Sequence, residues 1–138
     1  MGDVLRLRVA TPFGSVMDED VAKVTLRSSV GEFCALPSHC GLLAVLTPGR
    51  LMADTGQGVR TFVADDGFVE VGPDHVNVVT RRCEDAAKMD RAALEGEAGA
   101  LERRLSETPP REEPERIELM SELMWVRACL DATSSLTR

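Results

Sequence analysis

The hydrophobic pattern of the chain changes its period once, near Cys83. Before this point apolar and polar residues alternate, which is typical of strands that bury one face. After it, apolar residues recur every three or four positions, which is typical of amphipathic helices. A chain of 138 residues is long enough for one small domain with an appendage. The pattern therefore predicts a β domain followed by a helical segment.

The β half consists of short alternating runs separated by turn signals. Leu5, Leu7 and Val9 alternate with arginines, and Val24 and Leu26 alternate with polar residues. Turns are indicated at positions 47–49, 65–67 and 72–74, where glycine occurs beside proline or aspartate and tolerates the positive φ of a tight turn. A spacing of roughly ten residues between turns favours an all-β sandwich or barrel.

The helical half predicts two helices joined by a proline-rich break at positions 106–114. The first apolar stripe comprises Ala87, Leu94, Ala98, Leu101 and Leu105. The second comprises Leu119, Leu123, Val126 and Leu130, and its face is widened by Ile117, Met120 and Met124. Two amphipathic helices with a short connection predict an antiparallel hairpin.

Two features of this hairpin have two interpretations each. Gly96 and Gly99 cost the first helix about 1 kcal/mol each relative to Ala, so the helix either depends on its packing partner or lets the second helix approach closely. Met120, Met124 and Trp125 belong either to the hairpin's own core or to a partner-binding face. Both interpretations of this face hold if the hairpin opens.

Composition excludes several classes of function. The net charge is −7 and only 4% of the residues are aromatic, so neither the electrostatics nor the stacking surface of a nucleic-acid-binding protein is present. The four cysteines form no C-x-x-C pair and no zinc site with the two histidines, so we expect reduced thiols and no metal. No apolar run reaches the ~18 residues of a membrane span, and no signal peptide is expected. At a membrane, another subunit would have to hold this chain.

Three motifs resemble the epsilon subunit of F-type ATP synthases, which is called delta in mitochondria. The first comprises Gly31, Phe33, Leu36, Pro37, His39, Leu42 and Pro48-Gly49. The second is the run from Gly67 to Val71 with its following Val-x-Val-Val strand, and the third is Glu84-Asp85 followed by Arg91-Ala92. The family usually has Gly in place of Cys34 and Ala-Pro in place of Cys40-Gly41. The resemblance implies an α+β fold, with a β-sandwich of about ten short strands (1–83) and a C-terminal antiparallel helical hairpin (84–138).

The resemblance also implies a function. A family member is a non-catalytic central-stalk subunit of a proton-translocating synthase, lies peripherally on the cytoplasmic side of the bacterial plasma membrane, and couples the membrane ring to the shaft. Its partners are the gamma (shaft) subunit, the ring of c subunits and, through the hairpin, the catalytic beta subunits. The residues expected at the shaft or ring interface are Glu32, Phe33, Pro37, His39 and Leu42. The family's hairpin restrains ATP hydrolysis partly through basic residues, for which Arg103, Arg104 and Arg116 are the candidates here.

No cofactor is expected. In some bacterial relatives an Ile/Leu-Asp-x-x-Arg-Ala motif helps to hold ATP, but Ala87 and Lys88 replace its first two residues here. Only Arg91-Ala92 remains, so Arg91 is a weak ATP-binding candidate. The plain interpretation of Arg91 is a long side chain that reaches the edge of the hairpin.

Two other classes of function stay open. One is a stand-alone β-sandwich adaptor that dimerises through its helical hairpin. The other is a small hydrolase that uses Cys34 or Cys40 with His39. Because no Asn or Asp is placed to orient the imidazole, a structural or interface role for His39 is favoured.

Overall fold

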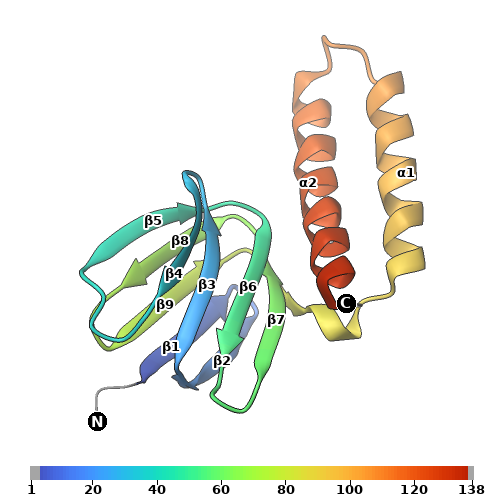
Figure 1. Ribbon diagram of the computed structural model, residues 1–138. Helices are drawn as coiled ribbons and strands as arrows, with labels where there is room; N and C mark the ends of the chain where they lie inside the picture. The colour runs from blue at the N-terminus through green and yellow to red at the C-terminus, as the bar shows by residue number, and fades with distance from the viewer. Residues whose placement is uncertain (1–3, 137–138) are drawn as a thin grey trace.

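The computed structural model describes residues 4–136 and shows a β-sandwich from which two long helices project (Figure 1). Ten strands lie in this part of the chain: β1 Leu5–Thr11, β2 Gly14–Val21, β3 Lys23–Ser28, β4 Gly31–Ala35, β5 Leu42–Leu46, β6 Gly49–Asp54, β7 Val59–Ala64, β8 Gly67–Val71, β9 His75–Thr80 and β10 Cys83–Asp85. A short 3-10 helix η1 (Ala86–Lys88), α1 (Arg91–Glu107) and α2 (Glu113–Leu136) follow. The predicted fold class is confirmed.

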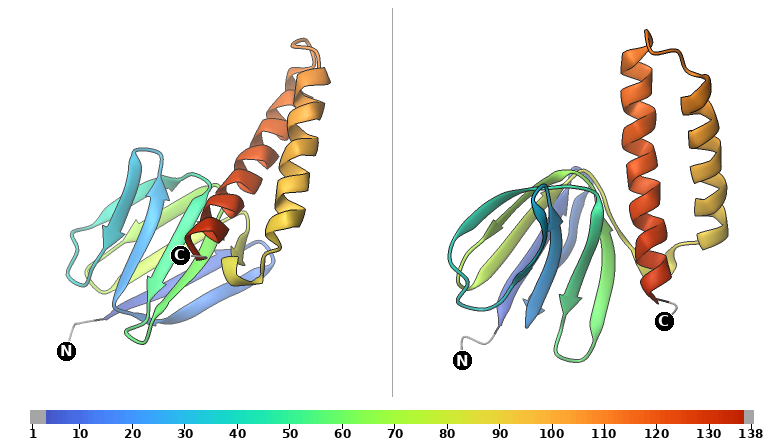
Figure 2. Two further views of the ribbon diagram at one scale, coloured as in Figure 1. Left: turned by 45° about the vertical axis from the view of Figure 1, so that its right-hand side comes forward. Right: turned by 45° about the horizontal axis from the view of Figure 1, so that its top comes forward.

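The strands form two facing layers that are joined where β3 meets β5 (Figure 2). One layer has the order β10-β7-β6-β3, with β4 also paired to β3, and the other has the order β5-β8-β9-β1-β2. All pairings are antiparallel except β1 with β9, which is parallel. The alternating residues identified in the sequence point inward: Leu5, Leu7 and Val9 are at most 1% exposed. The core is thus aliphatic, as the composition requires.

The sheet continues past the predicted domain boundary at residue 83. Strand β10 pairs with β7 through Cys83, Glu84 and Asp85. The helix predicted to include Ala87 begins later, at Arg91, because Asp90 has an extended backbone and its carboxylate accepts hydrogen bonds from the amides of Ala92 and Ala93. Ala87 lies instead in the 3-10 helix η1, where its side chain is exposed. Its place in the first stripe was therefore wrong.

The two helices pack antiparallel along their predicted stripes (Figure 1). Leu119, Leu123 and Val126 are buried, and Leu130 is partly buried. The predicted widening of the α2 face is wrong, because the three residues expected to widen it are exposed by about half or more: Ile117 at 58%, Met120 at 49% and Met124 at 50%. Trp125, which the sequence grouped with the two methionines, is only 5% exposed. The α2 surface therefore has a buried side and a separate exposed apolar side.

The helix glycines do not create a close approach between helices. A Cβ at Gly96 would have no atom within 4 Å, and at Gly99 the nearest would be the end of the Arg103 side chain at 3.6 Å. By contrast, a Cβ at Gly67 would overlap the carbonyl oxygen of Val79 and lie 2.8 Å from the Cα of Thr80. Glycine is thus required on packing grounds in the β8–β9 pair and not in α1.

This contrast predicts opposite effects of one substitution at two positions. Gly67→Ala should lower the free energy of unfolding by about 1–3 kcal/mol, because the backbone of β9 must move away. Gly96→Ala should raise it by about 0.4–1 kcal/mol, because alanine favours the helix and meets open space. Urea denaturation of the two variants beside the parent chain measures both. Equal destabilisation at the two positions would contradict this account.

Candidate functional site

The five residues predicted at the shaft or ring interface lie on β4, on β5 and in the loop between them. Glu32 is exposed, and its carboxylate lies 3.7 Å from the guanidinium of Arg50 on β6. Phe33 is half-buried and packs against the sandwich core, whereas Leu42 is 37% exposed. Pro37 is partly exposed. Their contact role stays a prediction, and Phe33 has a packing role within the chain itself.

The loop 36–41 is held against the turn between β8 and β9. The amide of Ser38 donates to the carbonyl of Pro73 at 2.7 Å, and the amide of His39 donates to the carbonyl of Leu36 at 3.1 Å. Nδ1 of His39 lies 2.6 Å from the carbonyl oxygen of Cys40. Within the described residues, no hydrogen bond joins His39 to a thiol and the four cysteines are unpaired. The thiol–imidazole pair that a hydrolase would need is not formed.

An apolar row crosses the outer surface of four neighbouring strands. Val45 on β5 pairs with Phe68 on β8, Phe68 pairs with Val79 on β9, and Val79 pairs with Ala10 on β1. The exposed fractions of Val45, Phe68 and Val79 are 49%, 58% and 60%. With Pro12, these four residues line an open groove of about 640 Å³. We call Ala10, Val45, Phe68 and Val79 the apolar face.

The apolar face is bordered by charged residues on the same layer. His75 lies between Asp74 at 2.8 Å and Glu70 at 3.3 Å. The hydrogen bond with Asp74, reinforced by the charge of Glu70, raises the pKa of His75. Arg6 pairs with Asp18 at 2.7 Å. A contiguous apolar patch with a polar border is a surface that soluble proteins use for contact with a partner.

Sequence reasoning missed the apolar face, although a signal for it was present. The adjacent pairs Phe68-Val69 and Val78-Val79 interrupt the alternation of strands β8 and β9. In each pair one residue faces the core and the other faces outward, since consecutive residues of a strand point to opposite sides. Val69 and Val78 are at most 1% exposed, whereas their neighbours are exposed.

A buried carboxylate lies where the sandwich meets the hairpin. Asp65, in the turn between β7 and β8, is 0% exposed. Its carboxylate accepts a hydrogen bond from the amide of Asp66 at 2.8 Å and lies 2.9 Å from the guanidinium of Arg81 and 2.8 Å from that of Arg82. Burial alone would raise the pKa of Asp65, but the Asp66 amide and the two arginines together hold it below its ordinary value.

Arg82 connects this carboxylate to the hairpin. It donates to Glu122 of α2 at 2.7 Å and lies over the ring of Trp125, 4.1 Å from the centroid. Arg81 makes a longer contact of 3.5 Å with the hydroxyl of Ser121. We call Asp65, Arg82, Glu122 and Trp125 the junction. No sequence pattern pointed to it, because its members come from three separate segments.

Of the thiols near the junction, Cys129 is buried and Cys83 is partly buried. Desolvation, reinforced by nearby carboxylates such as Glu84, raises the pKa of Cys129 on α2 and of Cys83 on β10 to about 12 in each case. Both thiols are therefore protonated at neutral pH in the folded chain, which lowers their reactivity there. Cys34 and Cys40 are exposed.

Arg91, the weak ATP-binding candidate, connects the start of α1 with the end of α2. Its guanidinium donates to the carbonyl of Leu130 at 3.2 Å, to the hydroxyl of Thr133 at 3.3 Å and to the hydroxyl of Ser134. It also pairs with Glu95 at 3.2 Å. These contacts place a cation near the carbonyl end of α2, where the helix dipole favours it.

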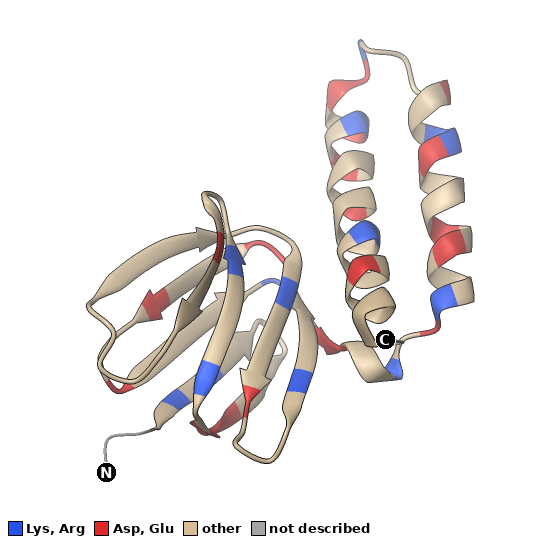
Figure 3. Ribbon diagram, viewed as in Figure 1, with Lys and Arg blue, Asp and Glu red and all other residues tan. Residues whose placement is uncertain are grey.

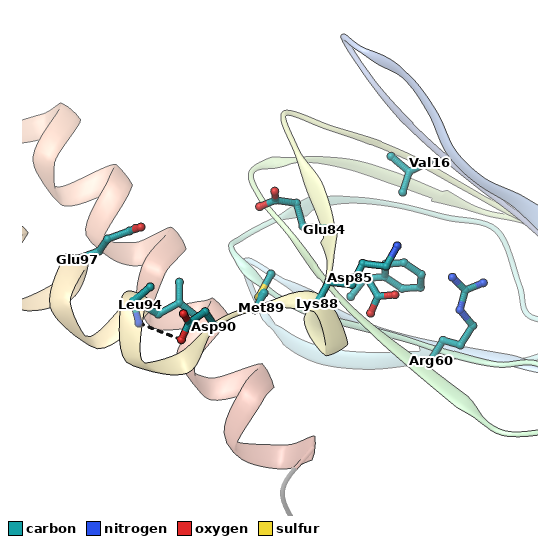
Figure 4. A pocket seen from close by; sticks show the side chains of 11 residues that line it. Val16, Arg60, Glu84, Asp85, Lys88, Met89, Asp90, Leu94 and Glu97 are labelled. Atoms are coloured by element: carbon teal, nitrogen blue, oxygen red, sulfur yellow. Dashed lines mark hydrogen bonds between the residues drawn. The ribbon is translucent and has the colours of Figure 1, made fainter.

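The cleft at the start of α1 has an acidic lining, and Arg91 is not part of it. It has a volume of about 540 Å³ and lies between the β7 side of the sandwich and the start of α1 (Figure 4). Its charged lining residues are Glu84, Asp85, Asp90, Glu97, Arg60 and Lys88. Four carboxylates against two cations disfavour a bound triphosphate. This agrees with the expectation that no nucleotide binds, which stays a prediction.

The three candidate regulatory arginines lie near the free end of the hairpin. Arg116 donates to the carbonyls of Leu105 at 3.0 Å and Thr108 at 2.8 Å. It thus provides hydrogen-bond donors for backbone carbonyls at the C-terminal end of α1. Arg103 and Arg104 are exposed, and Arg104 lies 3.9 Å from Glu115. Acidic and basic positions are interspersed along both helices (Figure 3). Their regulatory contact stays a prediction.

Residues 4–136 contain no group of three or more potential metal ligands of the His, Cys, Asp or Glu type. In the same residues, no helix is long and apolar enough to cross a membrane.

Comparison with known proteins decides the family. The model of the family "ATP synthase, Delta/Epsilon chain, beta-sandwich domain" matches residues 4–86, which is more than half of the chain. The chain belongs to the ATP synthase delta/epsilon family. The resemblance seen in the sequence motifs is thus confirmed, and the matched range extends through strand β10.

The relatives cover most of the chain. The ATP synthase epsilon chain 2 of Syntrophotalea carbinolica is 33% identical over 110 residues, which are 80% of this chain and 80% of that protein. The epsilon chain of Syntrophobacter fumaroxidans is 33% identical over 111 residues, 80% of this chain and 83% of that protein. The epsilon chain of Alkalihalophilus pseudofirmus is 39% identical over 90 residues, 64% of this chain and 68% of that protein.

Solved structures share the fold. A chain of the Euglena gracilis mitochondrial ATP synthase, solved as OSCP/F1/c-ring, superposes with a TM-score of 0.78 at 24% identity, covering 91% of this chain and 79% of that one. A chain of the Tetrahymena thermophila mitochondrial ATP synthase central stalk and c-ring gives a TM-score of 0.53 at 16% identity, covering 61% and 68%.

The burial of Asp65 predicts a pH-dependent contribution to stability. Because its pKa is lower in the folded chain than in the unfolded chain, the contribution is complete above the ordinary value of 3.8 and is lost as the pH falls toward the folded pKa. Asp65→Asn should remove this dependence and lower the free energy of unfolding at pH 7 by about 1.5–3 kcal/mol, because the hydrogen bonds from Arg81 and Arg82 lose their charged acceptor, although Arg82 keeps Glu122 as a partner. Denaturant titrations between pH 3 and 7 measure both effects. An unchanged pH profile in the variant would contradict this role.

Proposed function

We propose that the chain is a non-catalytic central-stalk subunit of a proton-translocating F-type ATP synthase, and that the apolar face binds the shaft (gamma) subunit. The observation that carries this proposal is the exposed row of Val45, Phe68 and Val79 on a closely packed sandwich. The choice of ATP synthase as the complex that the chain joins rests on family membership, since the relatives are named as ATP synthase epsilon chains. The packed sandwich deforms little and so suits the transmission of torque.

The apolar face fits a helical shaft better than a small ligand. Its groove is open and almost wholly apolar, formed by neighbouring strands with one proline at the rim. A site for a small polar substrate would need converging polar side chains inside a concave pocket. A row of aliphatic and aromatic side chains instead suits the hydrophobic core of a protein interface. The loop residues Pro37 and His39 and the nearby Leu42 lie at the other end of β5 and β8, beside the β8–β9 turn, so their predicted contact would be with a different part of the complex.

The turn between β3 and β4 is the proposed contact with the c-ring. Gly31 has φ +125°, which L side chains rarely adopt, and the neighbouring Val30 is 95% exposed. The hydroxyl of Ser28 closes the turn by donating to the carbonyl of Gly31 at 2.8 Å. Glu32 follows directly. A rigid turn that presents one apolar and one acidic side chain can touch the loops of a ring without deforming the sandwich.

The hairpin is the proposed regulatory element, reaching the catalytic beta subunits through Arg103 and Arg104. Residues from Glu84 onward include 13 acids and 8 bases, so these two arginines form a local basic contact on an acidic arm. Arg116 can join them only if its bonds to the end of α1 open. No cofactor is part of this proposal. The chain would lie at the cytoplasmic side of the bacterial plasma membrane, peripherally and through the complex alone.

The shaft contact is tested by a matched pair of valine substitutions. Val79→Glu places a charge on the apolar face and should weaken binding to the purified shaft subunit at least about tenfold, because a central apolar contact is lost and a carboxylate is desolvated. Val59→Glu is the control: Val59 is 58% exposed, close to the 60% of Val79, but lies on β7 in the other layer. Isothermal titration calorimetry measures both affinities. Equal affinities of the two variants would exclude the apolar face as the shaft contact.

The regulatory proposal is tested in the assembled synthase. Removing residues 90–138 leaves every strand and η1 in place and should increase the rate of ATP hydrolysis. Arg103→Ala with Arg104→Ala should reproduce part of this increase, because the basic contact is lost while the helix-forming tendency is kept. The comparison is made at equal subunit content in membranes. Hydrolysis that is unchanged by the truncation would exclude an inhibitory role.

A further inference from the structure

The hairpin is attached to the sandwich through one helix. The main contacts of the hairpin with β6, β7 and η1 come from α2, while α1 packs on the far side of α2 (Figure 2). On the sandwich side the apolar part of this contact comprises Val63 and Ala86. The α2 residues Trp125, Cys129 and Ala132 belong to the same apolar cluster, which also includes residues of α1. The apolar contact is therefore narrow compared with the core of the sandwich.

Charged contacts between the sandwich and α2 fix the position of α2 on this narrow apolar contact. Arg82 is the central one, since it touches Asp65 of the sandwich and both Glu122 and Trp125 of α2. A second pair joins Arg50 on β6 to Asp131 on α2 at 3.5 Å. Charge-assisted hydrogen bonds are stronger and more directional than neutral ones, so they define where α2 sits.

The two sides of the junction differ in what they lose when α2 leaves. Asp65 keeps its partners, because Arg81, Arg82 and the Asp66 amide all belong to the sandwich. Glu122 is 43% exposed at its side chain and would be fully solvated. No buried charge is left without a partner on either side. The junction can therefore open without the penalty that accompanies an unpaired buried ion.

We propose that the Arg82–Glu122 pair, with Trp125 under the guanidinium, is a latch that sets how often the hairpin detaches from an intact sandwich. Detachment breaks the Arg82–Glu122 pair, the longer and more exposed Arg50–Asp131 pair and a small apolar contact, and the sandwich stays folded. This inference concerns the free chain, so it stands or falls independently of assembly into a synthase. It predicts that the attachment weakens as salt screens the pair.

The cysteines allow this latch to be measured without additional labels. Cys129 is 1% exposed in the cluster between α2 and the sandwich, so it reports detachment. Cys83 lies on β10 against the sandwich core and reports unfolding of the sandwich. Cys34 is exposed and reports the intrinsic rate of the reagent. Alkylation with iodoacetamide, resolved by peptide mass spectrometry, follows the three thiols in one sample of the full chain.

Glu122→Gln should increase the alkylation rate of Cys129 about tenfold at low salt and leave the rates of Cys83 and Cys34 unchanged. This factor corresponds to the loss of one charge-assisted hydrogen bond. In the parent chain the rate at Cys129 should rise with KCl concentration, and in the variant it should depend on KCl far less. Glu118→Gln is the matched control, since Glu118 is exposed on the same helix and has no ion-pair partner among the described residues.

Two results would overturn the latch. If Cys129 and Cys83 become reactive in parallel, α2 leaves only when the sandwich unfolds, and no detachable state exists. If Glu122→Gln and Glu118→Gln give the same Cys129 rate, the Arg82–Glu122 pair does not control attachment.

Discussion

The arrangement of the two parts of the chain depends on the burial of one carboxylate. Asp65 is fully buried, and a buried carboxylate is tolerated only when charges and hydrogen bonds surround it. Two consecutive arginines at the end of β9 meet this requirement. They lie between β9 and β10, the last strand before the helices, and the second of them extends to α2. The ion pair that stabilises a turn of the sandwich thus also positions the hairpin.

The two layers of the sandwich have separate tasks under this account. The layer with β6 and β7 supports the hairpin, while the layer with β5, β8, β9 and β1 presents the apolar face outward. The two surfaces are joined by the turn between β7 and β8, where Asp65 and Gly67 lie only two positions apart. A partner on one surface and a movable arm on the other can therefore act through a common rigid body.

The sequence was informative where local patterns decide the structure. Alternation placed Leu5, Leu7 and Val9 inward, and the period of three to four residues placed Leu119, Leu123 and Val126 in the helix contact. The family motifs led to the correct fold and family. The pattern could not locate the start of α1, because Ala87 continues the helical stripe while Asp90 caps the helix that forms.

The hydrophobic pattern could not predict contacts between segments that are far apart in the sequence. Arg82 and Glu122 are 40 residues apart, and nothing in either neighbourhood indicates the other. Arg91 lay on the predicted stripe, but its bonds to the end of α2 depend on the register of the two helices. The apolar face is likewise a product of strand order, since Val45, Phe68 and Val79 become neighbours only when β5, β8 and β9 pair. A hydrophobic period is read within one segment, so it does not show which distant segments become neighbours.

Site-specific photo-crosslinking tests the central claim most directly. Phe68 is replaced by p-benzoylphenylalanine, the chain is assembled into the synthase in membranes, and the irradiated products are identified by mass spectrometry. An adduct between position 68 and the shaft subunit is the predicted result, with none from the same amino acid at position 59. An adduct joining two copies of this chain, or no adduct from position 68 in an assembled complex, would contradict the account.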